Sequence, residues 1–400
     1  MKGYEGFNIG LILNNTDSGI SPSFFQFTYT ESIHSILPSV ELNFSDTYGL
    51  LQENLTFCEG KEFLLYIKDG REDEDDDAKF IHLVSVSEDK SFSGENDTFI
   101  STNNRVTALH YFYTNDQIKS EGYEETSSAI IRRLIDNSAY KFQGINITNS
   151  DDKKIFYQPL LNDIDFIDSI LLKEAYSKSN TAYFCYIDSF DEFNYITYND
   201  MFNSKSIGKL SDIPEDIKQI GKNQILNYNI VNLGSKRLKG HRNKNIYSFT
   251  NEGKLDFDNF EIPEFLLGKN KVLPIIKKNN ANNISGFIDT LNQSYEDSEK
   301  SNINGRYIYD SKNCYFIERI HIVTTYNAKF RVGNKIELDL HLHDGEDVLL
   351  SSYYSGNWFI EVNSIVWDNI GKNLINNMIL FRSNFKVPSS QFDYDNFIKE

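Results

Sequence analysis

Short runs of alternating apolar and polar residues, each closed by a turn-forming cluster, constrain this chain more than any other feature. Val40, Leu42 and Phe44 alternate with polar neighbours, and the run ends in Asp-Thr-Tyr-Gly at 46–49. A second apolar run, KEFLLYIKDG, follows at 61–70. Alternation with a period of two predicts β-strands that bury one face and expose the other. The chain is therefore expected to be built mainly from strands.

The first 122 residues continue this pattern. FIHLVSV at 80–86 and VTALHYFYT at 106–114 are further strand candidates, because both are rich in β-branched and aromatic residues. The acidic run REDEDDDAK at 71–79 is expected to be an exposed, solvated loop between two strands, since packed like charges repel. Several short strands at this spacing predict a small barrel or sandwich.

Residues 123–205 follow a different pattern, that of a mixed α+β unit. The segment SAIIRRLIDN at 128–137 carries apolar residues at helical spacing, so a helix with one buried face is expected there. The residues on that face are Ile130, Ile131, Leu134 and Ile135. A second helix is expected at about 163–178, with Asn162 or Asp163 as its N-cap and with acidic residues in its first turns.

The second helix leads directly into an aromatic-rich segment at 181–199. Its composition predicts two strands joined by a turn at Ser189–Glu192. Cys185 lies inside the first of these strands, which favours an inert place in the core over a reactive thiol.

The last part of the chain contains a second strand-rich block. Residues 206–313 are rich in Asn, Lys and Ser and give no clear pattern. Alternation returns in KIELDLHL at 335–342, where the Ile and Leu residues fall on one face and the acidic and His residues on the other. The segments 357–369 and 373–384 complete the block as two further strands. The expected fold class is therefore α+β, mostly β.

Composition excludes several classes of function. The formal net charge of −18 disfavours a protein that grips nucleic acid, because such a field repels phosphates. Three widely spaced cysteines, Cys58, Cys185 and Cys314, fit a reducing compartment better than a disulfide framework. No signal-peptide pattern or membrane-spanning apolar stretch is present, so we expect a soluble product without a membrane anchor, made in the cytoplasm.

One pair of residues has the spacing of metal ligands. His341 and His343 alternate along a predicted strand and would project to the same side, with Asp339 and Asp344 as additional carboxylates. No third ligand at a known spacing accompanies them, and a polar outer strand face explains these residues equally well. We therefore predict no metal site.

Other candidate motifs fail on inspection. DKSFSGENDTFI at 89–100 resembles a calcium loop, but Ser91 and Ser93 replace strong ligands and Ile100 stands where a bidentate Glu is needed. The basic cluster KRLKGHRNK at 236–244 is the one place suited to a phosphate, and it reads more simply as a solvated loop or a salt-bridge partner of acidic surfaces. No catalytic, cofactor-binding or metal-binding residue is predicted, and no cofactor is expected.

The order of these pieces resembles one protein family. A strand ending in Asp-Thr-Tyr-Gly (46–49) leads to Glu59-Gly60-Lys61 and a second strand, and later a capped helix leads into an aromatic hairpin over 158–200. A Gly-Asn-Lys turn before a strand, AKFRVGNKIELDL (328–340), and a closing hairpin at 358–384 complete the set. The whole resembles the central baseplate hub of contractile-tailed phages of the T-even type, and more distantly the hub half of type VI secretion spikes.

The resemblance implies a division of the chain into domains. The first β-barrel tube domain would span 1–122, and an α+β accessory domain 123–205. The second barrel, with the C-terminal segment, would combine 206–247 with 314–400, and 248–313 would be an insertion or accessory region.

The resemblance also implies a structural role in the virion, made in the host bacterial cytoplasm. A homotrimer would present six similar barrels as a pseudo-hexameric ring that adapts the sixfold tail tube to the threefold central spike. Its partners would be the spike protein, the tail tube protein and other baseplate proteins. DNA and the tape-measure protein would pass through its channel without specific binding, and the chain would not be an enzyme.

The acidic composition suggests how such a channel would work. A lumen lined by carboxylates would repel phosphates, and the candidates for this lining are odd-numbered polar residues on the barrel strands. Two alternatives from other classes stay open at this point: a tail enzyme that degrades cell-wall polysaccharide, and a receptor-binding or carbohydrate-binding tail module whose abundant aromatic residues form an exposed platform.

Overall fold

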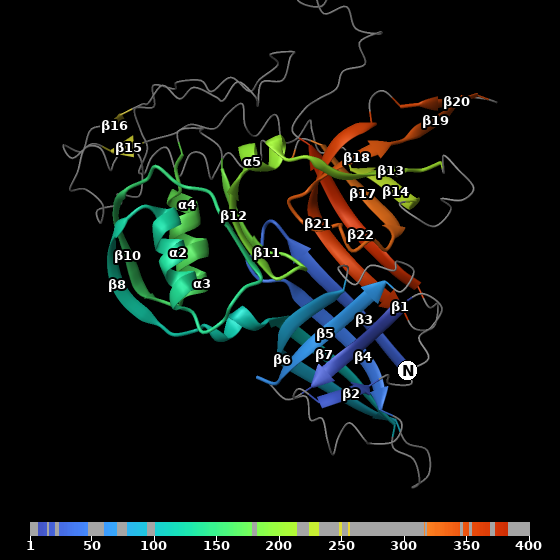
Figure 1. Cartoon of the computed structure of the whole chain (residues 1–400), viewed down its shortest axis with the longest axis horizontal. Helices are drawn as coiled ribbons and strands as arrows, with labels where there is room; N and C mark the ends of the chain where they lie inside the picture. The colour runs from blue at the N-terminus through green and yellow to red at the C-terminus, as the bar shows by residue number, and fades with distance from the viewer. Residues whose placement is uncertain are drawn as a thin grey trace, which may run out of the picture.

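The computed structural model describes residues 7–13, 16–20, 24–46, 60–69, 78–93, 101–177, 182–213, 224–231, 248–249, 255–256, 316, 318–344, 347–351, 354–368 and 373–382. These residues form many strands and few helices (Figure 1), which confirms the prediction of a mostly β protein with an α+β part. No helix within these ranges is long and apolar enough to cross a membrane.

One large sheet dominates the described structure. Its thirteen strands run in the order β14-β17-β22-β21-β3-β4-β7-β6-β5-β1-β2, and β18 joins β21 to β13. The bounds are β1 (Phe7–Leu13), β2 (Thr16–Ile20), β3 (Phe24–Ser32), β4 (Ser39–Asp46), β5 (Glu62–Asp69), β6 (Lys79–Ser93), β7 (Ser101–His110), β13 (Ser206–Ser211), β14 (Ile225–Val231), β17 (Glu318–Thr325), β18 (Lys335–Asp339), β21 (Gly356–Asp368) and β22 (Asn373–Arg382).

The two strand-rich blocks predicted at the ends of the sequence share this sheet. They meet where β3 pairs with β21 in antiparallel fashion, from Ser32 opposite Val362 to Gln26 opposite Asp368. Strand β3 uses its other edge for β4, so it links the two blocks instead of closing a barrel within the first. Among the described strands the pairing does not return on itself, and the two closed barrels expected from the sequence are not seen there.

The helices and the remaining strands lie mostly in the middle of the chain. The helix α2 covers the segment predicted to be helical and is capped by Thr126, whose side chain accepts a hydrogen bond from the amide of Ala129. The bounds are β8 (Lys119–Glu125), α2 (Ser127–Asn137), β9 (Gly144–Ile147), β10 (Lys154–Leu161), α3 (Asp163–Phe166), a π-helical segment (Ile167–Leu171), α4 (Leu172–Glu174), β11 (Tyr183–Ile187), β12 (Glu192–Thr197), α5 (Tyr198–Asn203), β15 (Ser248–Phe249), β16 (Leu255–Asp256), β19 (His341–Asp344) and β20 (Asp347–Leu350).

Three expectations need correction. The second helix begins after Asn162, one of its two predicted caps, but ends after Glu174 and not at 178, because Ala175 is extended and the carbonyl of Tyr176 accepts a hydrogen bond from the amide of Asp151. The strand predicted at 106–114 ends at His110, and a 3₁₀ turn follows over Tyr111–Thr114. The residue that ends the acidic run, Lys79, is not in a solvated loop; it starts β6 and is buried.

The apolar residues gather in three cores. The first core lies in the N-terminal block around Tyr29 and Leu65, the second in the C-terminal block around Trp358, and the third between α2, the second helix and the β8–β10 pair. Strand β11 serves two of them: Phe184 and Tyr186 belong to the second core, whereas the alternate residues Tyr183, Cys185 and Ile187 belong to the third. A strand covered on both faces must be apolar throughout, which explains its aromatic-rich sequence.

Candidate functional site: a shared sheet face and the polar junction behind it

One face of the large sheet runs without interruption across both blocks. The side chains that point to it alternate with core residues such as Tyr29, Leu42 and Ile365 along each strand. We call it the shared face; on the five central strands it consists of Ser39, Glu41 and Asn43 of β4, Gln26, Thr28, Thr30 and Ser32 of β3, Val362, Ser364, Val366 and Asp368 of β21, Asn373, Ile375, Asn377 and Ile379 of β22, and Arg319, His321, Val323 and Thr325 of β17.

Hydrogen bonds cross the seam between the two blocks on this face. The side-chain amide of Gln26 on β3 donates to Oδ1 of Asp368 on β21 at 2.9 Å. Two outward-facing pairs further along, the hydroxyls of Thr30 and Ser364 lie 3.1 Å apart. These contacts join residues more than 300 positions apart in the sequence, so the face behaves as one surface although two distant segments build it.

The charges on the shared face nearly balance. Glu41 pairs with Arg105 of the neighbouring β7, Nη2 to Oε2, at 3.0 Å, and Arg319 pairs with the buried Glu361 of β21. On the five strands the charged residues that point to this face are Glu41, Asp368 and Arg319, beside His321, and on the next two strands Arg105 of β7 lies opposite the exposed Asp89 of β6. These residues mix carboxylates with guanidinium groups and do not form the carboxylate lining expected from the acidic composition.

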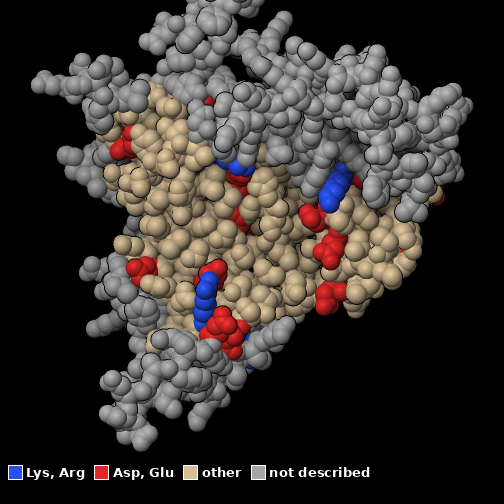
Figure 2. Space-filling model, turned by 180° about the vertical axis from the view of Figure 1, so that it is seen from behind, with Lys and Arg blue, Asp and Glu red and all other residues tan. Residues whose placement is uncertain are grey.

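From the sequence, odd-numbered polar residues are expected to face outward, and this holds on some strands only. Odd-numbered residues face outward on β4, β17 and β22, whereas even-numbered residues do so on β3 and β21. Strand parity depends on the pairing register, which the sequence alone did not give. Figure 2, which views the molecule from behind, shows Lys, Arg, Asp and Glu in a few separate groups on a mostly uncharged described surface.

A network of buried polar groups lies behind the sheet, where the two blocks meet the β11–β12 hairpin. At its centre, Glu31 is fully buried on β3. One of its carboxylate oxygens accepts hydrogen bonds from the side-chain amide of Asn363, at 2.9 Å, and the backbone amide of Val332, at 3.2 Å; the other accepts from Tyr29 at 3.2 Å. Burial raises the pKa of Glu31 to about 7, although nearby Lys79 acts in the opposite direction.

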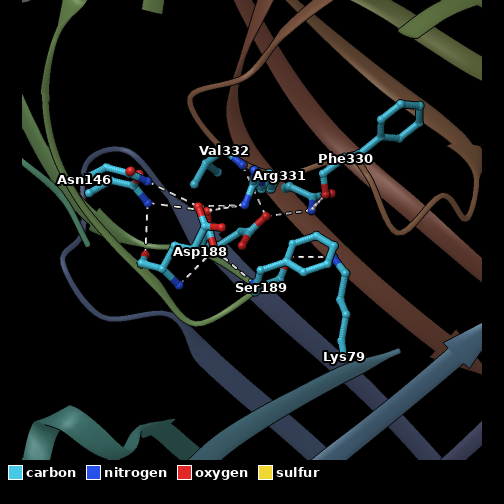
Figure 3. A network of polar contacts seen from close by, with 12 residues as sticks. Lys79, Asn146, Asp188, Ser189, Phe330, Arg331 and Val332 are labelled. Atoms are coloured by element: carbon cyan, nitrogen blue, oxygen red, sulfur yellow. Dashed lines mark hydrogen bonds and ion pairs between the residues drawn. The ribbon is translucent and has the colours of Figure 1, made fainter. Parts of the chain in front are cut away.

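Two cations extend the network toward the hairpin. Figure 3 shows Lys79 reaching from β6 toward Ser189, and Arg331 meeting Asp188. The ammonium of Lys79 donates to Oγ of Ser189 at 2.5 Å, and Nη1 of Arg331 lies 3.2 Å from Oδ2 of Asp188. Both cations also lie over the ring of Phe190, at 4.8 and 5.1 Å from its centroid. We call this set of contacts the polar junction; it ties the N-terminal block, the hairpin and the 326–334 loop together.

Pairing with opposite charges offsets the cost of burying the charged groups of the polar junction. Burial raises the pKa of Asp188, and the guanidinium of Arg331 opposes that rise. Arg331 also contacts Oε2 of Glu192 at 2.9 Å, so its charge is shared between two carboxylates. Removing one member of such a cluster would leave an uncompensated buried charge.

Sequence reasoning missed the polar junction. The acidic run predicts a solvated loop that includes Lys79, and the aromatic-rich segment predicts only a turn at Ser189–Glu192. The one sequence feature that marks this part of the polar junction is the Gly-Asn-Lys turn, which begins at Gly333. That glycine has φ of +78°, and a Cβ there would lie 1.9 Å from the hydroxyl of Tyr186. Only a glycine allows the 326–334 loop to pack this closely against the hairpin.

The metal candidates from the sequence do not converge in the described structure. Nδ1 of His341 lies 2.6 Å from Oδ1 of Asp212, and Asp339 pairs with Lys209 at 2.5 Å. The side chains of His343 and Asp344 lie outside the described residues. Within the described part of the chain, no group of three or more His, Cys, Asp or Glu residues is arranged to hold a metal ion.

The other candidate segments fall largely outside the described residues. The basic cluster at 236–244 lies there entirely, as do 94–100 of the calcium-like segment and 71–77 of the acidic run. The part of the calcium-like segment up to Ser93 belongs to strand β6.

A buried His-Asp pair also resembles catalytic machinery, and no sequence pattern predicted it. Nε2 of His110 lies 3.0 Å from Oδ1 of Asp191. The other ring nitrogen, Nδ1, accepts a hydrogen bond from the backbone amide of Phe112 at 3.2 Å. Since both nitrogens are engaged and the imidazole is buried, this pair holds the end of β7 against the hairpin and has no free position for proton transfer.

Comparison with known proteins places this architecture. No protein-family model matches the sequence, and no curated protein matches it either. Among solved structures, a tail protein from Neisseria meningitidis superposes with a TM-score of 0.56 at 7% identity, covering 95% of this chain and 98% of that one. The chain has the fold of phage tail proteins. The resemblance to baseplate hub proteins that the sequence suggested is thus confirmed at the level of the fold.

Two further structures are similar. The 43 kDa tail protein of prophage MuSo2 from Shewanella oneidensis gives a TM-score of 0.54 at 10% identity, with 94% of this chain and 98% of that chain covered. A type VI secretion system component of Escherichia coli, itself similar to tail proteins of bacteriophage T4, gives a TM-score of 0.49 at 9% identity, with 95% and 79% covered.

Proposed function

We propose that this chain is a structural hub protein of a phage tail baseplate and that three copies form a ring around a channel. In this proposal the two strand-rich blocks of each chain act as similar tube domains, so the trimer offers six to the sixfold tail tube and three equivalent surfaces to the central spike. The chain would reside in the virion and contact the spike, the tail tube protein and other baseplate proteins.

The observation that carries the proposal is the shared face. A sheet that continues from one block to the other, with its apolar side covered and its other side open, is the form that a segment of a tube wall requires. The seam is closed by backbone pairing between β3 and β21 and by side-chain hydrogen bonds on the face itself. Similarity to tail proteins over nearly the whole chain supports the same reading.

The chemistry of the shared face suits a channel through which DNA and the tape-measure protein pass without specific binding. Its side chains are mainly hydroxyls, amides and β-branched groups, and Arg105 and Arg319 are each paired with a carboxylate. A phosphate backbone would gain little from such a surface, because affinity for DNA comes mainly from unpaired Lys and Arg. The proposal thus replaces an acidic lining with a balanced one.

The polar junction gives the proposed wall its rigidity. The cations Lys79 and Arg331 and the carboxylates Glu31 and Asp188 hold the two blocks and the hairpin at fixed positions behind the sheet. No catalytic step and no cofactor enter this proposal, because its function is mechanical.

The test is the oligomeric mass and shape of the purified chain, measured by light scattering and negative-stain imaging. We expect three chains of 46.3 kDa each in a ring with an open centre. Purified tails of the phage should contain the chain in the same threefold form. A monomer at every concentration that is also absent from tails would contradict the proposal, and hydrolysis of cell-wall polysaccharide by that monomer would favour an enzyme.

A further inference from the structure

The β8–β10 pair forms a two-stranded ribbon with two unlike sides. Its inner side packs on the helices: Tyr123 stacks on Phe166 with ring centroids 5.6 Å apart, and the amide of Gln158 donates to Asp163 at 3.2 Å. Figure 1 shows the ribbon on the outer side of the helices, away from the large sheet. The two strands pair only with each other among the described residues.

The outer side of the ribbon is apolar and exposed. The solvent-exposed fractions are 53% for Ile155, 57% for Tyr157, 72% for Leu160 and 70% for Ile118 in the adjoining loop. We call these four residues, together with Gly122 opposite Tyr157, the ribbon face. Several large apolar side chains grouped on one open surface of a soluble protein indicate a contact site, whereas single ones do not.

The backbone places Leu160 on this face at a cost. Leu160 is the extra residue of a β-bulge between Pro159 and Leu161, and its φ is +53°. A left-handed conformation is unfavourable for any residue with a Cβ, and Gly or Asn would adopt it more readily. An apolar side chain kept outward by a strained backbone points to a use for that side chain.

The centre of the ribbon face has room for a partner's side chain. A Cβ added at Gly122 would meet no atom within 4 Å, so the space beside Tyr157 is open. The hydroxyl of Tyr157 lies 2.7 Å from that of Ser120 on the neighbouring strand, which holds the ring in place. The face therefore presents an ordered aromatic side chain beside an open position.

The rim of the ribbon face is acidic. Asp116 in the adjoining loop and Glu124, which lies opposite Ile155, are exposed there. Two lysines lie on or next to the ribbon. The ammonium of Lys119 is paired with the carboxylate of Asp163 at 2.7 Å, and Lys153 is exposed. The rim thus favours a basic partner, and it opposes a second copy of a chain whose formal net charge is −18.

We propose that the ribbon face docks a different tail protein, one that presents an apolar segment flanked by Lys or Arg. The apolar side chains would fill the space beside Tyr157 and Gly122, and the cations would meet Asp116 and Glu124. This inference rests on the proposed function for its source of partner, since it takes the partner from the same tail.

The experiment uses a photo-crosslinking phenylalanine analogue in place of Tyr157, in a chain produced during phage infection. Purified tails are first assayed for the chain, then irradiated, and the cross-linked peptides are identified by mass spectrometry. The same analogue in place of Ile145, an exposed apolar residue on β9, which belongs to neither the large sheet nor the ribbon, serves as the matched control. Absence of the chain from tails contradicts the proposed function, whereas its presence without a cross-link from 157 contradicts only the inference.

Variants at Gly122 sharpen the result because the open position makes unfolding improbable. We expect position 157, but not 145, to cross-link to one other tail protein through a peptide with apolar residues next to Lys or Arg. Gly122→Lys should lower the yield of the cross-link from position 157, measured per chain in tails, by about tenfold or more, because it places a cation against the partner's cations. Gly122→Ser should leave this cross-linking yield unchanged. A cross-link to this chain itself, to an acidic peptide, or one insensitive to Gly122→Lys would overturn the inference.

Discussion

The shared face and the ribbon face are both the outer sides of sheets whose inner sides pack on a core, yet they carry opposite chemistry. The shared face presents Thr28, Thr30 and Ser364, with its charges balanced, whereas the ribbon face presents Ile155 and Tyr157. The alternation of a strand indicates which side meets the core. The other side differs in keeping with the roles we propose for it: contact with passing DNA and water on the shared face, and contact with a protein surface on the ribbon face.

The two surfaces also differ in what lies behind them. The shared face is backed by the polar junction, which includes a buried glutamate, a buried lysine and a glycine in close contact with the hairpin. The ribbon is backed by an apolar core in which Tyr123 and Phe156 are buried. Substitutions behind the shared face should therefore cost much more stability than substitutions on the ribbon face.

The largest expected difference is between two glycines, one from each region. Gly333→Ala should destabilise the protein by about 3 kcal/mol or more, because it combines a positive φ with a Cβ that overlaps the hydroxyl of Tyr186. Gly122→Ala should change stability by less than about 0.5 kcal/mol, since its Cβ meets nothing within 4 Å. Urea unfolding of both variants measures the difference; equal effects would show that the loop is not held against the hairpin as described.

The next prediction concerns pH and isolates the polar junction. The pKa of Glu31 is raised from 4.5 to about 7, so the folded protein binds this proton more tightly than the unfolded chain. The stability that this proton contributes is complete below about pH 4.5 and is lost as the pH rises to about 7, a loss on the order of 3 kcal/mol.

Replacement of the carboxyl by an amide should remove this dependence. Glu31→Gln should flatten the stability profile between about pH 4.5 and about pH 7 and make the variant relatively more stable at the upper end. Glu41→Gln, which changes an exposed carboxylate on the shared face, is the control and should keep the wild-type slope. Urea unfolding at a series of pH values is the measurement, and identical slopes for wild type and Glu31→Gln would refute the assignment.

The variant with the smallest expected effect on stability tests whether the shared face lines the channel. Thr30→Lys combined with Ser364→Lys adds two unpaired cations at the seam without touching the core. If the face lines the channel, genome ejection should slow at low salt and recover as salt is raised, because the added cations bind phosphates electrostatically. Thr114→Lys with Asn137→Lys, at exposed positions away from the face, is the matched control. Ejection rates indistinguishable from the control would place the channel elsewhere.

Much of the local structure could be predicted from the sequence. The strands β4, β5, β21 and β22 and the helix α2 were expected from periodicity, and Asn162 was one of the two residues expected to cap the second helix. Periodicity and capping are properties of residues near one another in the chain, and for that reason they are legible without a structure. The second helix was overextended because a long-range backbone contact ends it.

The candidate site was much less predictable. The seam joins Gln26 to Asp368, and the polar junction joins Lys79 to Ser189 and Arg331 to Asp188, so every contact that defines them spans a long stretch of sequence. The alternating pattern gave no register between β3 and β21, so it could not say which residues would share a face. The expected acidic lining was inferred from the total charge, which does not specify where the charges lie.

The sequence by itself determined that this chain is strand-rich, where most strands and helices lie, and which side of each strand is apolar, because these depend on steric and hydrophobic preferences repeated along a few residues. Only the tertiary structure decided that both strand-rich blocks share one sheet, that Lys79 and Glu31 are buried behind it, and that Ile155, Tyr157 and Leu160 stay exposed. Those outcomes depend on pairing between distant segments, where register and the surrounding charges determine which polar groups are buried and which apolar groups are not.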